Sequence, residues 1–192
     1  MYFKHYLKPI SLVLIAFSFP QVFAVTSINI QTTFYNISGT DSKSIQKSLS
    51  TYGPTGKDGK RYHALTNWKI DWNYRWISSN THCQLEKVEV NTDVTYLMPE
   101  LSSKPSLSKI MHNRWNRYYL ALFKHEQQHK DYAVSAAKEL DRELNTLKLQ
   151  PCAQLEKNIS AQAQSILDKY KRLEKGFDRR TEHGIKQGVL LP

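Results

Sequence analysis

A chain of 192 residues is long enough for one domain with its own hydrophobic core and too short to make two domains the expectation. Its formal net charge is +10, from 27 Lys and Arg against 17 Asp and Glu. The basic residues are scattered along the chain, so the charge alone selects no partner among anionic envelope polymers, membrane surfaces and solvent. The absence of internal repeats excludes solenoid and repeat-array proteins.

The first 24 residues are predicted to be a secretory signal peptide. Two lysines precede an apolar run over residues 10–19, and Val22 and Ala24 occupy the −3 and −1 positions of a cleavage site. The run is about half as long as a segment that spans a bilayer, so an uncleaved membrane anchor is the less favoured alternative. We therefore expect an exported, soluble mature chain of residues 25–192, periplasmic or extracellular, without a stable membrane anchor.

The first half of the mature chain is predicted to form strands. Residues 25–37 are rich in β-branched and aromatic side chains. Residues 67–77 and 83–98 alternate apolar and polar side chains, which is typical of strands with one buried face. The connection 78–82 is short, so these two strands are expected to form an antiparallel hairpin. A short helix, ended by Gly53, is expected between the first two strands.

The second half is predicted to form helices. Apolar side chains recur at three- and four-residue steps over residues 109–149, and Pro151 ends this pattern. A second periodic segment covers residues 152–175, with Gly176 as its expected C-cap, and the tail from residue 177 is expected to be extended or turning. Strands followed by helices indicate the α+β class, with a small antiparallel sheet packed against two long C-terminal helices in one domain.

The segment FKHEQQHKDYA, residues 123–133, carries the side chains suited to metal chemistry. His125 and His129 are four residues apart, so on a helix both imidazoles project from one face and can reach one zinc ion. Glu126 is placed to reach a water on that zinc, which is the HExxH arrangement of zinc hydrolases. Both histidines also fall in line with the apolar stripe of the helix. Two core histidines with ordinary hydrogen-bond partners are the alternative, but the ligand spacing favours a metal.

A catalytic zinc site needs a third protein ligand and one open position. Tyr132 and Ser135 stand where a metzincin would have Gly and His, so that class is excluded. Glu156, Glu174 and His183 remain as alternatives, and spacing alone does not choose among them.

The two cysteines, Cys83 and Cys152, belong to no CxxC pair, so zinc ligation by thiolates has no supporting spacing. In an exported chain an even pair of cysteines is typical of a disulfide, with two free thiols as the alternative.

Four stretches occur in a distinctive order over about residues 30 to 185: NWKIDWNYRW, VEVNTDVTYLMP, HEQQHKDYA and the distal DRRTEHG. This order resembles the predicted secreted zinc-dependent proteases grouped as domain-of-unknown-function family 922. The resemblance implies a zincin-like metallopeptidase fold, with the long helix that bears HExxH as its active-site helix. The residues it assigns are the zinc ligands His125, His129 and His183, the general base Glu126, and the disulfide Cys83–Cys152.

These observations together predict a zinc metallopeptidase that hydrolyses an amide bond in a peptide, protein or peptidoglycan-type substrate. One Zn²⁺ would activate a water, and Glu126 would accept its proton. Asp178 or Glu182 is expected to orient a ligand imidazole. Beside the zinc, one further donor to the oxyanion is expected, and the sequence does not choose among its four alternatives, Tyr118, Tyr132, His112 and Arg180.

Two other classes of function are compatible with the residues. The first is a non-catalytic envelope binding module with a structural or vestigial metal, although a structural site has no need of Glu126. The second is nucleic-acid or membrane-surface binding through the tryptophans of residues 68–76, which could stack on bases. Tryptophans at strand spacing are more often a core face, and export makes nucleic acid a poor partner.

Overall fold

The sheet comes from the N-terminal half of the chain, where apolar and polar side chains alternate. Its long strands are β1 (Val25–Ile37), β2 (Leu65–Ser79) and β3 (His82–Leu101), and β4 (Gln150–Pro151) adds a short pairing to β3. The computed structural model describes residues 25–102 and 104–191. The predicted signal peptide, residues 1–24, lies outside the described residues.

The strand order is β1-β3-β2, and the sheet is mixed rather than antiparallel throughout. β2 and β3 form the predicted antiparallel hairpin, closed by a tight turn in which Asn80 has a φ of 53°. β1, in contrast, pairs with β3 in parallel, which corrects the expectation of a purely antiparallel sheet. The reason is that β3 enters between the two earlier strands, which themselves run in opposite directions.

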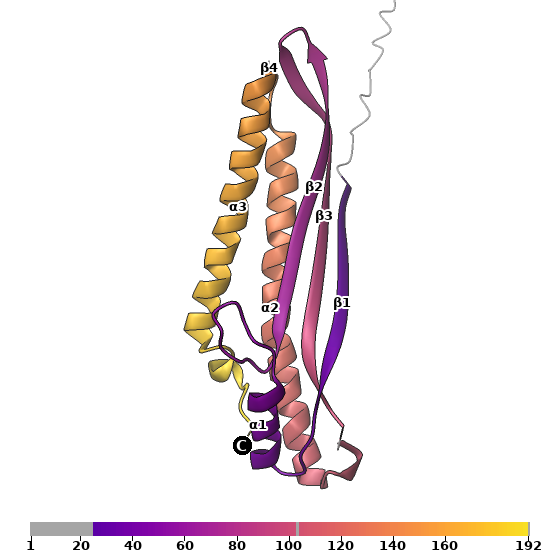
Figure 1. Ribbon diagram of the computed structural model, residues 1–192, viewed down its shortest axis with the longest axis vertical. Helices are drawn as coiled ribbons and strands as arrows, with labels where there is room; N and C mark the ends of the chain where they lie inside the picture. Colours follow the sequence, from indigo (N-terminus) through magenta and orange to yellow (C-terminus); the bar gives the residue numbers. More distant parts are fainter. Residues whose placement is uncertain (1–24, 103, 192) are drawn as a thin grey trace, which may run out of the picture.

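Two long helices cover one face of this sheet (Figure 1). α2 (Lys109–Asn145) begins at Ser108, whose side chain accepts a hydrogen bond from the Met111 amide, and α3 (Cys152–Thr181) returns alongside it. The short α1 (Ser42–Tyr52) packs at the lower end and ends before Gly53, as predicted. The α+β class, with a sheet against two long C-terminal helices, is confirmed.

The predicted C-cap at Gly176 is wrong, because α3 continues through it to Thr181. Gly176 and Phe177 are both buried, and the Phe177 ring stacks on the ring of His125 with centroids 4.8 Å apart. This packing offsets the cost of about 1 kcal/mol that a glycine imposes inside a helix. As a result Asp178 lies on α3 and not in an extended tail.

Two hydrophobic clusters fill the space between the layers. The upper one joins β2, β3, α2 and α3, and the lower one joins α1, α2 and the ends of β1 and β3. On α2 the lower cluster ends at Leu122 and the fully buried part of the upper one begins at Ala136. The HExxH segment lies between them and is held from both sides by packed apolar side chains.

Cys83 at the start of β3 and Cys152 at the start of α3 form a disulfide, so the predicted pairing is confirmed. The bond ties the upper end of the sheet to the upper end of the helical layer. None of the helices in the described part of the chain has the length and apolar character needed to cross a membrane.

Replacing both cysteines (Cys83→Ala with Cys152→Ala) should lower the free energy of unfolding by about 4 kcal/mol. The cysteines are 69 residues apart, and opening so long a loop increases the entropy of the unfolded chain. Guanidinium unfolding of the purified variant and wild type measures the difference. A loss below about 1 kcal/mol would contradict this account of the bond.

Candidate metal centre

The HExxH residues occupy the buried face of α2, as the helix phase predicted. His125, Glu126 and His129 are 4%, 4% and 9% exposed. The two imidazoles meet edge to face with centroids 5.1 Å apart. Three polar groups on one helix face are therefore withdrawn from water and must find partners within the protein.

Asp178 on α3 is in close contact with both imidazoles. Its Oδ1 atom lies 3.2 Å from Nε2 of His125 and 3.0 Å from Nε2 of His129. The three side chains each offer a ligand atom within 4.8 Å of the other two, which is a spacing that one metal ion can bridge. The sequence had suggested Asp178 only as a residue that orients an imidazole.

The far nitrogen of each imidazole is held by an oxygen from another part of the chain. Nδ1 of His125 lies 2.8 Å from Oε1 of Gln187, and Nδ1 of His129 lies 3.3 Å from Oε1 of Glu174. These oxygens can only accept, so both Nδ1 atoms donate and, in the neutral rings, both Nε2 lone pairs face Asp178. In metal sites of other proteins, a hydrogen bond at one ring nitrogen commonly fixes the tautomer and the orientation of the histidine that binds the metal through the other.

Three acceptors that face one another repel unless a positive charge lies between them. Burial opposes the protonation of His129, but hydrogen bonds to Asp178 and Glu174 outweigh it and raise the pKa of His129 to about 10. Burial likewise opposes the ionisation of Asp178, but hydrogen bonds from the two histidines hold its pKa well below its usual range. The carboxylate is therefore compensated by a proton on His129 or by a cation that displaces it.

Glu126 points from α2 towards the sheet. Thr66 on β2 donates its hydroxyl to Oε2 of Glu126 at 2.6 Å. Burial raises the pKa of Glu126, although the Thr66 hydrogen bond and the two histidines oppose the shift. No hydrogen bond within the described residues engages Oε1, so one carboxylate oxygen is held and the other can accept a proton.

His183 lies beside this cluster. It follows α3 in a left-handed turn and its side chain is 51% exposed. Its Nδ1 is 3.9 Å from Oδ1 of Asp178, and its ring lies 5.0 Å from the ring of Tyr62. Asp178, and not His183, is the third member of the closely spaced group. The role of His183 as a ligand stays a prediction.

Gly184 explains why the chain can turn so close to the site. Its φ is 86°, and a Cβ atom there would lie 2.6 Å from Cγ2 of Val189 and 3.2 Å from Cγ of His125. The turn leads into η2 (Ile185–Gln187), which brings Gln187 to the same imidazole. The DRRTEHG segment therefore contains Asp178, which lies at Nε2 of His125. The turn at its end places Gln187 at Nδ1 of the same ring.

The other residues suggested by the sequence lie farther from the cluster or are engaged elsewhere. Tyr132 packs edge to face on Phe177 with centroids 6.0 Å apart, and Arg180 is exposed on α3. Glu156 is exposed near the start of α3, at the opposite end of that helix from the site. The Tyr118 hydroxyl is engaged by His63 at 2.8 Å.

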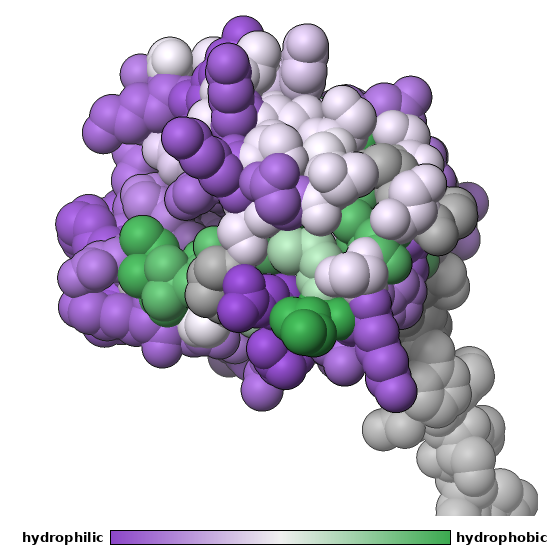
Figure 2. All heavy atoms as spheres, turned by 90° about the horizontal axis from the view of Figure 1, so that it is seen from below, coloured by the Kyte–Doolittle hydropathy of each residue, from purple (hydrophilic) through white to green (hydrophobic). Residues whose placement is uncertain are grey.

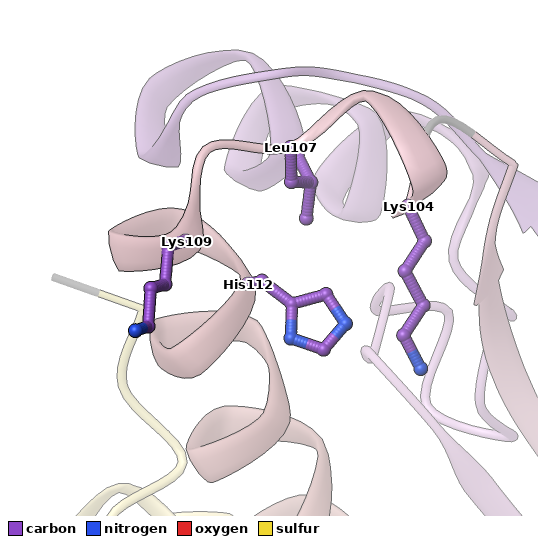
Figure 3. Close-up of a pocket in the computed structure, with 4 residues that line it drawn as sticks. All are labelled: Lys104, Leu107, Lys109 and His112. Carbon is purple, nitrogen blue, oxygen red and sulfur yellow. The ribbon is translucent and has the colours of Figure 1, made fainter.

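His112 belongs to a separate cavity at the lower end of the molecule. This open cavity of about 480 Å³ is lined by His112 together with Lys104, Leu107 and Lys109 (Figure 3). His112 is thirteen residues before His125 on α2, which is about 20 Å along the helix. It is therefore not placed to act at the cluster.

Sequence reasoning missed Thr66 and Gln187, and it considered Glu174 only as a ligand. Glu174 and Asp178 are four residues apart, so on one helix they share a face. This signal was available, but the expected helix end at Gly176 separated them. Thr66 and Gln187 carry no comparable spacing signal, because each approaches α2 from a distant segment.

A family model described as "Bacterial protein of unknown function (DUF922)" matches residues 32–184. The matched region contains the three clustered residues, Glu126, His183 and both cysteines. No curated protein and no solved structure shows a significant match to the chain.

Gly184→Ala should lower the free energy of unfolding by about 2–4 kcal/mol, because the new methyl group overlaps Val189 and crowds His125. Gly59→Ala is the matched control, since Gly59 has a similar φ of 78° but no heavy atom within 4 Å of the methyl group that the substitution adds. That control should cost only about 1 kcal/mol. Urea unfolding measures both, and equal losses would show that the close approach to His125 is unimportant.

Proposed function

The chain belongs to the DUF922 family of bacterial proteins of unknown function, and on that premise we propose that it is a metal-dependent hydrolase of amide bonds. The observation that carries the proposal is the convergence of two imidazole nitrogens and one carboxylate oxygen, with the far side of each imidazole held by an acceptor. We propose His125, His129 and Asp178 as the protein ligands of one metal ion.

The donor set fits zinc. Two imidazoles and one carboxylate are a common ligand set of catalytic zinc sites, and three protein ligands leave a position open for substrate. The same set also suits Fe²⁺, so metal analysis of the purified protein decides the identity. A bound zinc ion would act as a Lewis acid that polarises a substrate carbonyl and makes a nearby water more acidic.

Glu126 is the proposed general base. Thr66 holds one of its oxygens, so the carboxylate is fixed while Oε1 remains able to accept a proton from water. Its raised pKa makes it a stronger base than an exposed carboxylate and a competent acid in the return step, when it passes the proton to the leaving amine.

Glu174 and Gln187 are proposed to hold the two imidazoles in the orientation in which both Nε2 atoms can bind the metal ion. Glu174 accepts from both His129 and the Trp68 indole at 2.8 Å, so its oxygen is held by the sheet while it orients the ligand. Gln187 does the same for His125 from η2. Removing either residue should weaken metal binding by about 10–100-fold without removing a ligand.

The proposed substrate is a peptide, protein or peptidoglycan-type amide, and the proposed location is the periplasm or the extracellular space. The Cys83–Cys152 disulfide is consistent with export to an oxidising compartment. Residues 25–192 are proposed to form one zincin-like metallopeptidase domain.

A second candidate is a non-catalytic envelope module with a structural metal. The near-complete burial of His125, Glu126 and His129 favours it, because structural sites are closed to water. The role of Glu126 distinguishes the two candidate functions, because the hydrolase needs Glu126 for proton transfer and a structural metal site does not.

Glu126→Gln tests the base. We expect the variant to bind zinc as wild type does and to lose hydrolysis by a factor of about 100–10,000, because the amide cannot accept a proton. The assay is turnover of a panel of peptides and peptidoglycan fragments, with zinc content measured on the same samples. Activity close to wild type would remove Glu126 from the mechanism. No hydrolysis by either protein across the panel would favour the structural module.

Single alanine substitutions test the ligands. His125→Ala and Asp178→Ala should each weaken zinc binding by more than about 100-fold, because each removes a direct ligand. His183→Ala should retain affinity within about threefold, since its imidazole is outside the close group. Competition with a zinc chelator measures all three. Loss of zinc in His183→Ala with retention in Asp178→Ala would reverse the assignment and restore His183 as the third ligand.

A further inference from the structure

The two edges of the sheet differ in how they are protected. β2, one edge, carries Lys69, Asp71 and Arg75 and has a register shift after Arg75. These are the features by which natural edge strands avoid pairing with other molecules. β1, the other edge, contains no Asp, Glu, Lys, Arg, Pro or Gly over its 13 residues. Within residues 25–102 and 104–191, β1 pairs only with β3, so its outer edge has no partner strand.

β1 also exposes apolar side chains. Ile28, Ile30 and Phe34 are 37%, 49% and 53% exposed. Ile28 and Ile30 pair with Thr92 and Val94 of β3, which are buried beneath the helices, so strand alternation places the row on the helix side of the sheet. The two long helices lie mainly over β2 and β3 (Figure 1), and residues 27–34 of β1 are exposed, whereas its end at Ile37 packs into the lower hydrophobic cluster.

We propose that β1 is the interface of a homodimer, in which it pairs antiparallel with β1 of a second copy across a two-fold axis at Gln31. The two sheets would then form one continuous sheet across the dimer. Thirteen residues extend about 43 Å, so the new pairing would satisfy a long row of backbone groups that now face solvent.

Charge favours a second copy as the occupant. The chain has a formal charge of +10, so two copies repel one another wherever basic surfaces meet. Of the described helices and strands longer than two residues, β1 is the one without a charged side chain. The lower end of the molecule, in contrast, presents mainly hydrophilic side chains with small apolar patches between them (Figure 2). β1 is thus the long element that two identical basic molecules can bring together without placing like charges opposite one another.

The pattern of β1 is complementary to itself in this register. With Gln31 on the axis, Ile28 lies opposite Phe34 of the second copy and Ile30 lies opposite Thr32. On the other face Asn29 lies opposite Thr33, so polar side chains meet polar ones. A shift by one residue would place the apolar row of one copy against the polar face of the other.

Light scattering on purified protein over a concentration series tests the assembly. Wild type should have the mass of two chains, and Ile30→Lys should have half that mass, because its charge would lie at the centre of the neutral interface. Leu120→Lys is the matched control, since Leu120 is 65% exposed on α2 and undergoes the same change of side chain. Circular dichroism establishes that both variants are folded. A wild type that is monomeric up to millimolar concentration, or an equal effect of both variants, overturns the proposal.

Disulfide trapping tests the register. Residues opposite one another in an antiparallel pair have Cα atoms about 4.5–5.5 Å apart, which a disulfide can span. Gln31→Cys should therefore give a covalent dimer on oxidation, and the native cysteines do not interfere because they are already bonded to each other. Asn29→Cys is the control, since its two copies would be offset by four residues, or about 13 Å. Cross-linking through Asn29→Cys and not Gln31→Cys overturns this register. A wild-type protein that dimerises only through another surface leaves both variants uncross-linked and overturns the interface itself.

Discussion

One contact organises the functional end of the molecule: the carboxylate of Asp178 must meet two imidazole nitrogens from the opposite helix. Each of these groups is costly to bury alone, and together they are stable only when positive charge compensates the carboxylate. The contact requires α3 to continue past Gly176, so the helix tolerates a glycine in its interior. Beside this contact, the ring of Phe177 stacks on the ring of His125 and packs α3 against α2.

The sheet takes part in the site through a single strand. Thr66 and Trp68 are two residues apart on β2, so both side chains point towards the helices. Thr66 holds the proposed base, and Trp68 holds Glu174, which in turn holds His129. The proposed base and one proposed ligand are thus both held by the same strand, and the two hydrophobic clusters on either side restrict movement of α2 against it. Groups that must keep a fixed geometry for proton transfer gain from such support.

The two edges of the sheet have separate tasks. β2 faces the helical layer with the residues that support the site, and its charged side chains discourage pairing at its own edge. β1 contributes nothing to the site and has no such protection. The proposed chemistry and the proposed assembly therefore use opposite edges of one sheet, and a substitution in β1 that disrupts the proposed dimer would leave the proposed metal ligands in place.

Periodicity was sufficient to predict the α+β class, the order of the long strands and helices, and the burial of His125, Glu126 and His129, because it reports neighbours within one element. It could not place the parallel pairing of β1, the passage of α3 through Gly176, or the closeness of Asp178 to the histidines. These depend on contacts between segments that are about 50 or more residues apart, whose distances come from packing and not from spacing along the chain. The positions of Asp178 and His183 show the difference most clearly. Both lie in the same short motif, but only the continuation of the helix turns one towards α2 and leaves the other at the surface.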